Sequence, residues 1–329
     1  MQEHISTGII GTGSFLPERV VTNFHLEETV DTSDDWIRHR TGIVQRRIAD
    51  INTAASDLAI PAAEKALRSA GIKADQIDLI IVATITPDMF FPATACVVQN
   101  SIGAKNAAAF DISAACTGFV YGITVADQFI KSSACKYILV IGAEVLSKIL
   151  DWSDRNTCVL FGDGAGAAVL GPVRKQKGIL HSKLRSDGSG GEFLMLPGGG
   201  SRIPPSNYSI ENKLHYLKMS GSDIFKFATK IIEEATLEAL EHCDLKVDNI
   251  DLLIPHQANS RIINSAAKRL KLPLEKVWMN ISKYGNMSAA SIPVALDEAL
   301  AERKIKDDSL VLLVGFGGGL TWGVTVIQW

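Results

Sequence analysis

Cys116 is the residue whose neighbours best equip it to act as a nucleophile. It lies in the segment DISAACTGFVYGITVADQFI (111–130), where small residues surround it and an apolar, helix-like stretch follows at once. A cysteine at the start of a helix lies beside unpaired backbone N–H groups and the positive end of the helix dipole, which favour the thiolate. Small neighbours would also let a carbonyl group approach the sulfur. The alternative is a buried structural cysteine, the usual state of an isolated thiol.

Two polar side chains in the second half of the chain could act beside such a thiol. His256 directly follows the apolar run LLIP (252–255), and the carboxyl ends of parallel strands face the crevice where α/β sheets bind ligands. Asn286 lies in a glycine-bearing turn, YGNMSAASIP (284–293), that precedes another apolar stretch. Each also has an ordinary structural explanation, a hydrogen-bonded core histidine and a turn asparagine.

An internal repeat predicts the elements that position these residues. Shifted by 173 residues, the segment that ends in KADQIDLII (73–81) falls on the one that ends in KVDNIDLLI (246–254), and ILVIG (138–142) falls on VLLVG (311–315). In each half, helical stretches alternate with short apolar runs, which predicts βαβ units and sheets buried on both faces. We therefore expect two similar α/β halves, 1–173 and 174–329, packed as one body. Cys116 and His256 fall opposite alanines in this repeat, so each belongs to one half only.

Composition excludes several classes of protein. The chain of 329 residues is 47% hydrophobic and 21% charged, as in an ordinary globular protein, and its net charge of −3 gives no reason to expect nucleic acid or a membrane surface as a partner. Its five cysteines include no C-x-x-C pair, which favours a reducing compartment. No basic stretch precedes an apolar run at the N-terminus, so we expect no signal peptide and a cytoplasmic location.

Two further segments have readable patterns. Residues 310–329 carry no charge over the length of a membrane span, but five glycines among them favour two buried strands joined by a glycine-rich turn. Residues 187–207 are rich in Gly, Pro and Ser, which predicts a long surface loop.

Together the segments around Cys116, His256 and Asn286 resemble the β-ketoacyl-acyl-carrier-protein synthase III family, the initiating condensing enzymes of fatty-acid synthesis. The motifs are AACTGF, PHQAN and GNMSAASIP, and the similarity extends over essentially the whole chain, from IIGTGSFLP to FGGGLTWG. The resemblance implies a thiolase-like α/β fold of two pseudo-symmetric halves in a layered α-β-α-β-α body. Elongating synthases carry a second histidine in place of Asn286, and thiolases carry a cysteine where this chain has Gly315.

The resemblance also implies a reaction, the decarboxylating condensation of a short acyl-CoA such as acetyl-CoA with malonyl-acyl-carrier protein. Cys116 would take up the acyl group, activated by its helix and by His256, while the N–H groups of Cys116 and Gly318 form the oxyanion hole. His256 and Asn286 would donate hydrogen bonds to the malonyl thioester oxygen as CO₂ leaves. No metal or redox cofactor is needed for this chemistry.

Other positions match substrate-binding residues of the family. Trp36, Arg40 and Arg155 resemble the residues that hold the CoA adenine and phosphates, by stacking and charge pairing, and Asn259 resembles a neighbour of the pantetheine tunnel. A half-buried tryptophan and solvated arginines are the plain alternatives. Phe91 resembles the aromatic residue that closes the primer pocket from a partner subunit, which implies a homodimer.

A basic stretch follows His256. Residues 255–283 contain six Lys or Arg and one Glu, and we expect Arg261, Lys268 and Arg269 to dock the acidic acyl carrier protein rather than only to solvate a helix. Two other functions stay open on the sequence, a related condensing enzyme of secondary metabolism with longer or aromatic acyl groups and a non-catalytic acyl-binding relative. The complete set of Cys116, His256 and Asn286 argues against the second.

Overall fold

A five-stranded mixed sheet forms the first half of the molecule. The structure, a computed structural model, describes residues 5–329. Residues 1–4 lie outside the described residues; they include the start of the predicted first half, 1–173, and of the N-terminal segment for which no signal peptide is expected. β4 runs parallel to β5 and β6, whereas β7 is antiparallel to β6 and β1. In spatial order the strands are β1 (Ser6–Phe15), β7 (Gly164–Val173), β6 (Ile138–Glu144), β4 (Leu79–Ala83) and β5 (Ala108–Ile112).

A four-stranded sheet in the second half repeats this strand order, but it has no strand that corresponds to β5. β11 runs parallel to β12, and the remaining pairs are antiparallel. The strands are β11 (Leu252–Pro255), β12 (Leu310–Gly317), β13 (Thr321–Gln328) and β8 (Gly178–Ser186). The charge-free segment 310–329 thus forms two paired strands, as predicted, and no helix within residues 5–329 is long and apolar enough to cross a membrane.

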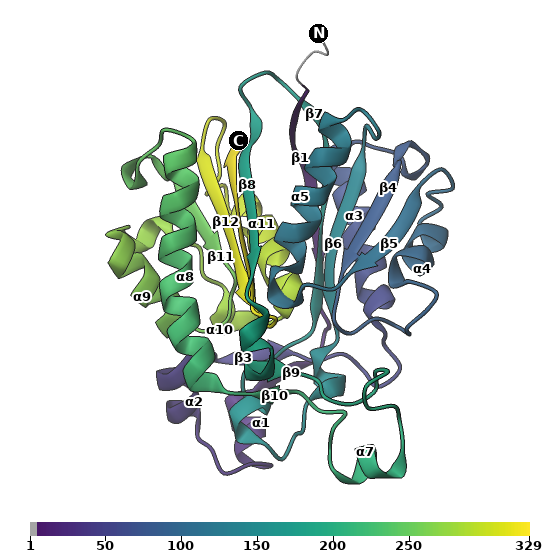
Figure 1. The fold of residues 1–329 in the computed structure, drawn as a ribbon, viewed down its shortest axis with the longest axis vertical. Coiled ribbons are helices and arrows are strands. Elements are labelled where there is room, and N and C mark those ends of the chain that lie inside the picture. The colour runs from purple at the N-terminus through teal and green to yellow at the C-terminus, as the bar shows by residue number, and fades with distance from the viewer. Residues whose placement is uncertain (1–4) are drawn as a thin grey trace.

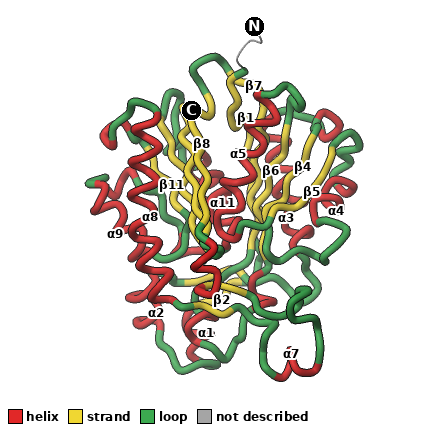
Figure 2. Tube along the Cα trace, in the orientation of Figure 1, coloured by secondary structure: helices red, strands yellow, loops and turns green. Residues whose placement is uncertain are grey.

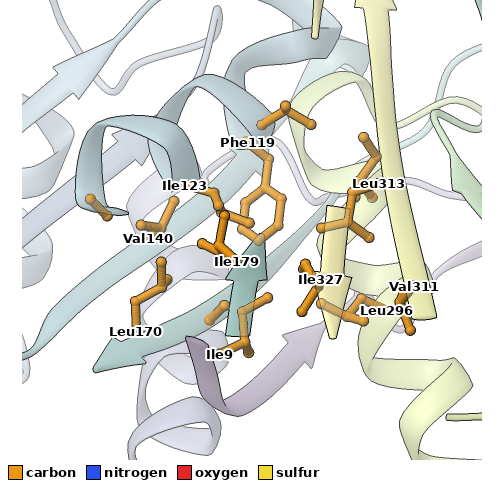
Figure 3. Packing of buried hydrophobic residues seen from close by; sticks show 14 of the residues in the cluster. Ile9, Phe119, Ile123, Val140, Leu170, Ile179, Leu296, Val311, Leu313 and Ile327 are labelled. Carbon is orange, nitrogen blue, oxygen red and sulfur yellow. The ribbon is translucent and has the colours of Figure 1, made fainter. Parts of the chain in front are cut away.

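Helices cover both sheets and fill the space between them (Figure 1). The central pair packs against both sheets in one apolar cluster that includes Phe119, Leu296 and Leu313 (Figure 3). The central helices are α5 (Gly118–Lys131) and α11 (Ser291–Ala301), and the outer ones are α3 (Ala55–Ala70) and α4 (Thr94–Ser101) on the first sheet and α8 (Gly221–His242) and α9 (Ser260–Leu270) on the second. This arrangement confirms the predicted α-β-α-β-α layers.

The repeat is visible in the turns that precede the central helices. Short 3₁₀ turns at 115–117 and 288–290 lead directly into α5 and α11. Their first residues, Ala115 and Ser288, both have left-handed backbone angles, with φ of +45° and +46°. Each half therefore brings the same sharp turn to the same end of its sheet, and Cys116 lies in the first of them.

Short elements gather at the end of the molecule where these turns lie (Figure 2). They are β2 (Val20–Thr22), α1 (Asn23–Glu27), α2 (Asp34–Thr41), β3 (Gln45–Arg47), α6 (Arg155–Cys158), β9 (Leu194–Met195), α7 (Asn207–Glu211), β10 (Lys218–Met219) and α10 (Ile281–Tyr284). The segment 187–207 is mostly exposed, as predicted for a surface loop, but it also contains β9, which pairs with β10. Beyond this segment Leu217 is 4% exposed and packs with Leu146 and Phe161.

Candidate active site

Cys116 is held in a tight, buried turn. Only 5% of its surface is exposed. Gly317, at the end of β12, lies so close that a Cβ atom added to it would stand 2.8 Å from Cys116 Cβ and 3.1 Å from Sγ. A glycine at this position therefore lets the two halves of the molecule meet at the sulfur.

His256 leaves the end of β11 and is fixed by backbone and ring contacts. Its N–H donates to the Val314 carbonyl at 2.8 Å. The imidazole meets the Phe316 ring edge-on, with 5.2 Å between ring centroids, and is 1% exposed. The ring is thus set in an apolar surrounding beside the end of β12.

Asn286 has its side-chain orientation determined by one hydrogen bond. Its backbone N–H donates to Leu160 O, and its carbonyl accepts from Gly162 N–H, both at 2.9 Å. The side-chain Oδ1 accepts from the Ser288 N–H at 2.8 Å. Since a backbone N–H can only donate, Oδ1 must face it, and the Nδ2 amino group is left to donate elsewhere.

One cavity of about 390 Å³ joins these three side chains to the surface. Cys116, His256 and Asn286 line its inner part, and Trp36 and Arg261 line it too. The three residues come from different elements and from both halves, so the fold brings together the set that the sequence predicted. Within residues 5–329, no group of three or more His, Cys, Asp or Glu could hold a metal ion.

The ionisation of the site differs from the sequence prediction. Burial raises the pKa of Cys116 to about 12, with Glu144 contributing in the same direction. The expected resting thiolate is therefore wrong, because loss of water outweighs the start of the helix. Burial also lowers the pKa of His256 to about 3, so the imidazole is neutral at pH 7. The resting pair is a thiol and a neutral histidine.

A second, apolar cavity of about 180 Å³ lies on the other side of the sulfur. Leucines from the 187–220 excursion, among them Leu194 and Leu217, form part of its wall. Gly318 lines this cavity together with Cys116, whereas Gly317 lines the larger one. An aliphatic acyl group attached to Cys116 would fit the apolar lining.

The outer end of the larger cavity carries the residues expected to bind CoA. The Ser33 hydroxyl caps α2 by accepting the Trp36 N–H at 3.1 Å, which fixes the helix that presents Trp36 and Arg40. The guanidinium groups of Arg40 and Arg155 lie 5.9 and 5.3 Å from the indole centroid. Trp36 and Arg40 line the cavity together with Asn259, whereas Arg155 is absent from the lining and reaches the site through the Trp36 ring.

Asn259 has a structural role that the sequence did not indicate. It caps α9, because its Oδ1 accepts the Arg261 N–H at 2.8 Å, and its Nδ2 donates to the Arg40 carbonyl at 3.0 Å. It therefore links the beginning of α9 to the end of α2, two helices at the cavity mouth.

Besides Arg155, three of the predicted positions do not line the two cavities beside Cys116. Phe91 is 83% exposed, on a segment next to the edge strand β5. Lys268 and Arg269 are exposed on α9, about two helical turns beyond Arg261, and Arg269 forms an ion pair with Glu233 of α8. Arg261 alone of the basic set reaches the cavity, where its guanidinium lies 5.5 Å from the Phe225 ring centroid.

Sequence reasoning missed several residues that touch the site. Phe316 packs on His256, and Ser288 lies beside Asn286 and the acyl cavity. Glu144 ends the apolar run of β6, fully buried. Glu144 could have been identified from the sequence, because a charged residue at the end of an apolar strand is unusual. The sequence around Ser288 and Leu194 has no such feature.

Comparison with known proteins agrees with this geometry. A family profile described as 3-Oxoacyl-[acyl-carrier-protein (ACP)] synthase III C terminal matches residues 240–329, and one described as 3-Oxoacyl-[acyl-carrier-protein (ACP)] synthase III matches residues 110–188. Beta-ketoacyl-[acyl-carrier-protein] synthase III of Caldanaerobacter subterraneus subsp. tengcongensis is 57% identical over 329 residues, which cover 100% of this chain and 99% of that protein. The same enzyme of Clostridioides difficile is 58% identical over 98% of both chains. The crystal structure of 3-oxoacyl-[acyl-carrier-protein] synthase III from Aquifex aeolicus VF5 is 50% identical and aligns with a TM-score of 0.91 over 98% of this chain and 100% of that one. The chain belongs to the β-ketoacyl-[acyl-carrier-protein] synthase III family of condensing acyltransferases.

Proposed function

We propose that this chain condenses a short acyl-CoA with malonyl-acyl-carrier protein, with loss of CO₂, to give the β-ketoacyl-acyl-carrier protein that begins fatty-acid synthesis. The observation that carries the proposal is the single cavity that joins Cys116, His256 and Asn286 to Trp36 and Arg40. A cysteine there forms a thioester that is itself reactive, so one site can serve both acyl transfer and condensation.

In the first step, the Cys116 sulfur attacks the acyl-CoA carbonyl and CoA leaves. The apolar cavity behind the sulfur receives the acyl chain. The N–H groups of Cys116 and Gly318 stabilise the oxyanion, in water-free surroundings where such donors act strongly. Trp36, Arg40 and Arg155 hold the nucleotide end of CoA at the mouth.

In the second step, the malonyl thioester enters the larger cavity and loses CO₂. The negative charge that develops on the thioester oxygen is stabilised by Asn286 Nδ2, which is free because Ser288 holds Oδ1, and by the N–H of neutral His256. The resulting carbanion attacks the acyl-cysteine carbon and displaces the Cys116 sulfur. The chemistry requires no metal or redox cofactor.

The acyl carrier protein docks against the basic face of α9, formed by Arg261, Lys268 and Arg269. These cations suit an acidic partner, and Arg261 lies at the mouth through which the malonyl group would enter.

A homodimer is the second part of the proposal, with Phe91 of one copy closing the acyl cavity of the other. β5 is an edge strand, and the N–H groups of Thr94 and Ala95, just after Phe91 in the chain, donate to the carboxylate of Asp111 on this strand. Phe90 and Phe91 are both above 80% exposed. Apolar surface at an unpaired sheet edge favours pairing with another chain. The two halves of each copy would be 1–173 and 174–329, and the location the cytoplasm.

Intact-mass measurement tests the covalent step. Wild-type protein mixed with acetyl-, isobutyryl- or octanoyl-CoA should gain one acyl mass, and Cys116→Ser should gain none. Cys243→Ser, which removes a half-buried thiol far from the cavity, is the matched control and should behave as wild type. An undiminished adduct on Cys116→Ser would refute the proposal.

A further inference from the structure

Glu144 is a buried carboxyl group for which acyl transfer has so far given no role. It ends β6 with no exposed surface. Its oxygens accept hydrogen bonds from the Thr86 hydroxyl at 2.6 Å, the Thr84 hydroxyl at 3.2 Å and the Ile85 N–H at 3.2 and 3.3 Å. Burying a carboxyl without a cation is costly, so its presence beside a reactive thiol calls for an explanation.

Ser288 lines the apolar cavity together with Cys116, and its turn packs against β6, the strand that ends in Glu144. The Ser288 hydroxyl is close enough to both groups to stabilise their ionised forms. It is buried and forms no hydrogen bond of full geometry with any partner, so it is free to donate to either side. The left-handed turn at Ser288 holds it there, and the Ser288 N–H is already used by Asn286. The three groups thus form one buried cluster, in which the Ser288 hydroxyl can turn toward the sulfur or toward the carboxyl.

The groups that face Glu144 leave it able to change its charge. They are the hydroxyls and the N–H of residues 84–86, the Ser288 hydroxyl of the turn 288–290 and the Cys116 thiol. No Lys, Arg or His within residues 5–329 forms an ion pair with Glu144. Burial raises the pKa of Glu144 to about 7. A carboxyl of this kind binds or releases a proton readily at neutral pH.

His256 is poorly suited to accept the thiol proton. Its ring is completely buried, its Nδ1 atom has no hydrogen-bond partner, and no carboxylate offsets the charge of an imidazolium. When the Glu144 carboxylate accepts a proton, a buried charge is removed. When His256 accepts one, a buried charge is created, so Glu144 is the better proton acceptor for Cys116.

We propose that Glu144 accepts the proton of Cys116 through the Ser288 hydroxyl during acylation and returns it when condensation frees the sulfur. In acylation, the S–H bond breaks, its proton passes to Ser288 Oγ as the Ser288 proton passes to Glu144, and the new S–C bond expels CoA as a thiolate that takes a proton from water. In condensation, the S–C bond breaks and the sulfur regains its proton by the reverse path. The proposal rests on acyl transfer to Cys116, and one proton is taken up from water per turnover.

The test is the pH dependence of acylation, followed by single-turnover CoA release and intact mass. In wild type, the rate should rise with pH to a plateau with a midpoint near 7. Glu144→Gln keeps an acceptor for the Ile85 N–H, but it cannot take a proton. Its amino group replaces the oxygen to which both threonine hydroxyls donate, so these hydroxyls must turn to accept from it. We expect it to acylate roughly 10²-fold more slowly at pH 8 and to lose the midpoint, which is the usual size of a general-base effect. A variant that keeps the wild-type midpoint and rate overturns the proposal.

Two further variants separate this role from a structural one. Ser288→Ala interrupts the relay and should lose the same midpoint; if Glu144→Gln does not fold, an unchanged midpoint in Ser288→Ala overturns the proposal. Asp163→Asn removes another buried carboxyl of raised pKa, which binds Ala49 and Ser147 outside both cavities, and should keep the wild-type profile. Absence of any acyl adduct on wild type would instead refute acyl transfer itself.

Discussion

In the proposed decarboxylation, neutral His256 and the oriented Asn286 amide would act as a pair of uncharged hydrogen-bond donors. The Phe316 contact and the burial of His256 exclude the water that would stabilise an imidazolium. An uncharged donor costs little to bury, and it still stabilises an oxygen that becomes negative in the transition state.

This predicts that decarboxylation does not depend on the ordinary titration of histidine. Because the pKa of His256 is lowered to about 3, the ring stays neutral above that pH and is protonated only below it. Release of CO₂ from malonyl thioester, measured in Cys116→Ala to remove acyl transfer, should be flat between about pH 5 and 8. His256→Ala and Asn286→Ala should each slow it by about 10²–10³-fold. If CO₂ release by Cys116→Ala, in which His256 and Asn286 are both present, changes with a midpoint near pH 6.5, His256 is not neutral over this range.

At the scale of elements, the end of β12 determines how closely the second half approaches Cys116. Replacing Gly317 with alanine would place a methyl group 2.8 Å from Cys116 Cβ and 3.1 Å from its backbone nitrogen, so the 115–117 turn must shift. A displacement of about 1 Å at a reacting atom can cost roughly 10²-fold in rate. We therefore expect Gly317→Ala to fold but to acylate about 10²-fold more slowly, as followed by CoA release. Gly188→Ala, where nothing lies within 4 Å of an added Cβ, should acylate normally; equal rates in both variants would refute the close contact.

Patterns within single elements could be predicted from the sequence, whereas contacts between distant segments could not. The repeat predicted β4, β6, β11 and β12 within a few residues, because buried strands and their flanking helices have a strong local signature. Cys116, His256 and Asn286, which line the larger cavity, could be predicted from the sequence motifs that contain them. The protonation of Cys116 was predicted wrongly, because it depends on how much water the other half of the molecule excludes. The leucines of the segment 187–220 that line the apolar cavity were also missed, because the composition of a loop does not indicate which distant residues it packs against.

The α9 helix carries a prediction about the carrier protein. Its apolar face, including Ile262 and Ile263, is buried against the second sheet and α8, which leaves Lys268 exposed. A surface charge pair is worth up to about 1 kcal/mol, so Lys268→Glu should raise KM for malonyl-acyl-carrier protein roughly fivefold and leave KM for acyl-CoA unchanged. Lys175→Glu, in the turn between β7 and β8 at the far end of the molecule, is the charge-matched control (Figure 1). Equal effects of the two reversals, in steady-state assays at low salt, would show that docking lies elsewhere.

For the whole molecule, duplication explains both the active site and the surface that remains uncovered. Each half contributes a left-handed turn next to the candidate site, and one turn contains Cys116 while the other contains Ser288 beside Asn286. The sheets also differ: β5 extends the first one as a full strand, whereas at the corresponding edge of the second sheet only a single parallel bridge joins Val277 to Leu253 of β11. The first sheet therefore ends in a longer edge strand, and this strand carries the partly exposed Phe110.

This unpaired edge predicts the assembly. Phe110 lies on β5 and is 36% exposed, and the strand has a free row of backbone groups. A charge placed there would be buried unpaired if two copies join along β5, so Phe110→Asp should shift the protein from dimer to monomer in sedimentation equilibrium. Phe24→Asp changes a more exposed phenylalanine, 61% accessible on α1 away from this edge, and should remain dimeric. If Phe91 closes the acyl cavity of the other copy, the Phe110→Asp monomer should also lose its preference for acetyl-CoA over octanoyl-CoA. The proposed dimer would be contradicted if the wild-type protein is a monomer. The same holds if Phe110→Asp remains a dimer with unchanged primer preference, and the acyl cavity would then be closed by residues of its own chain.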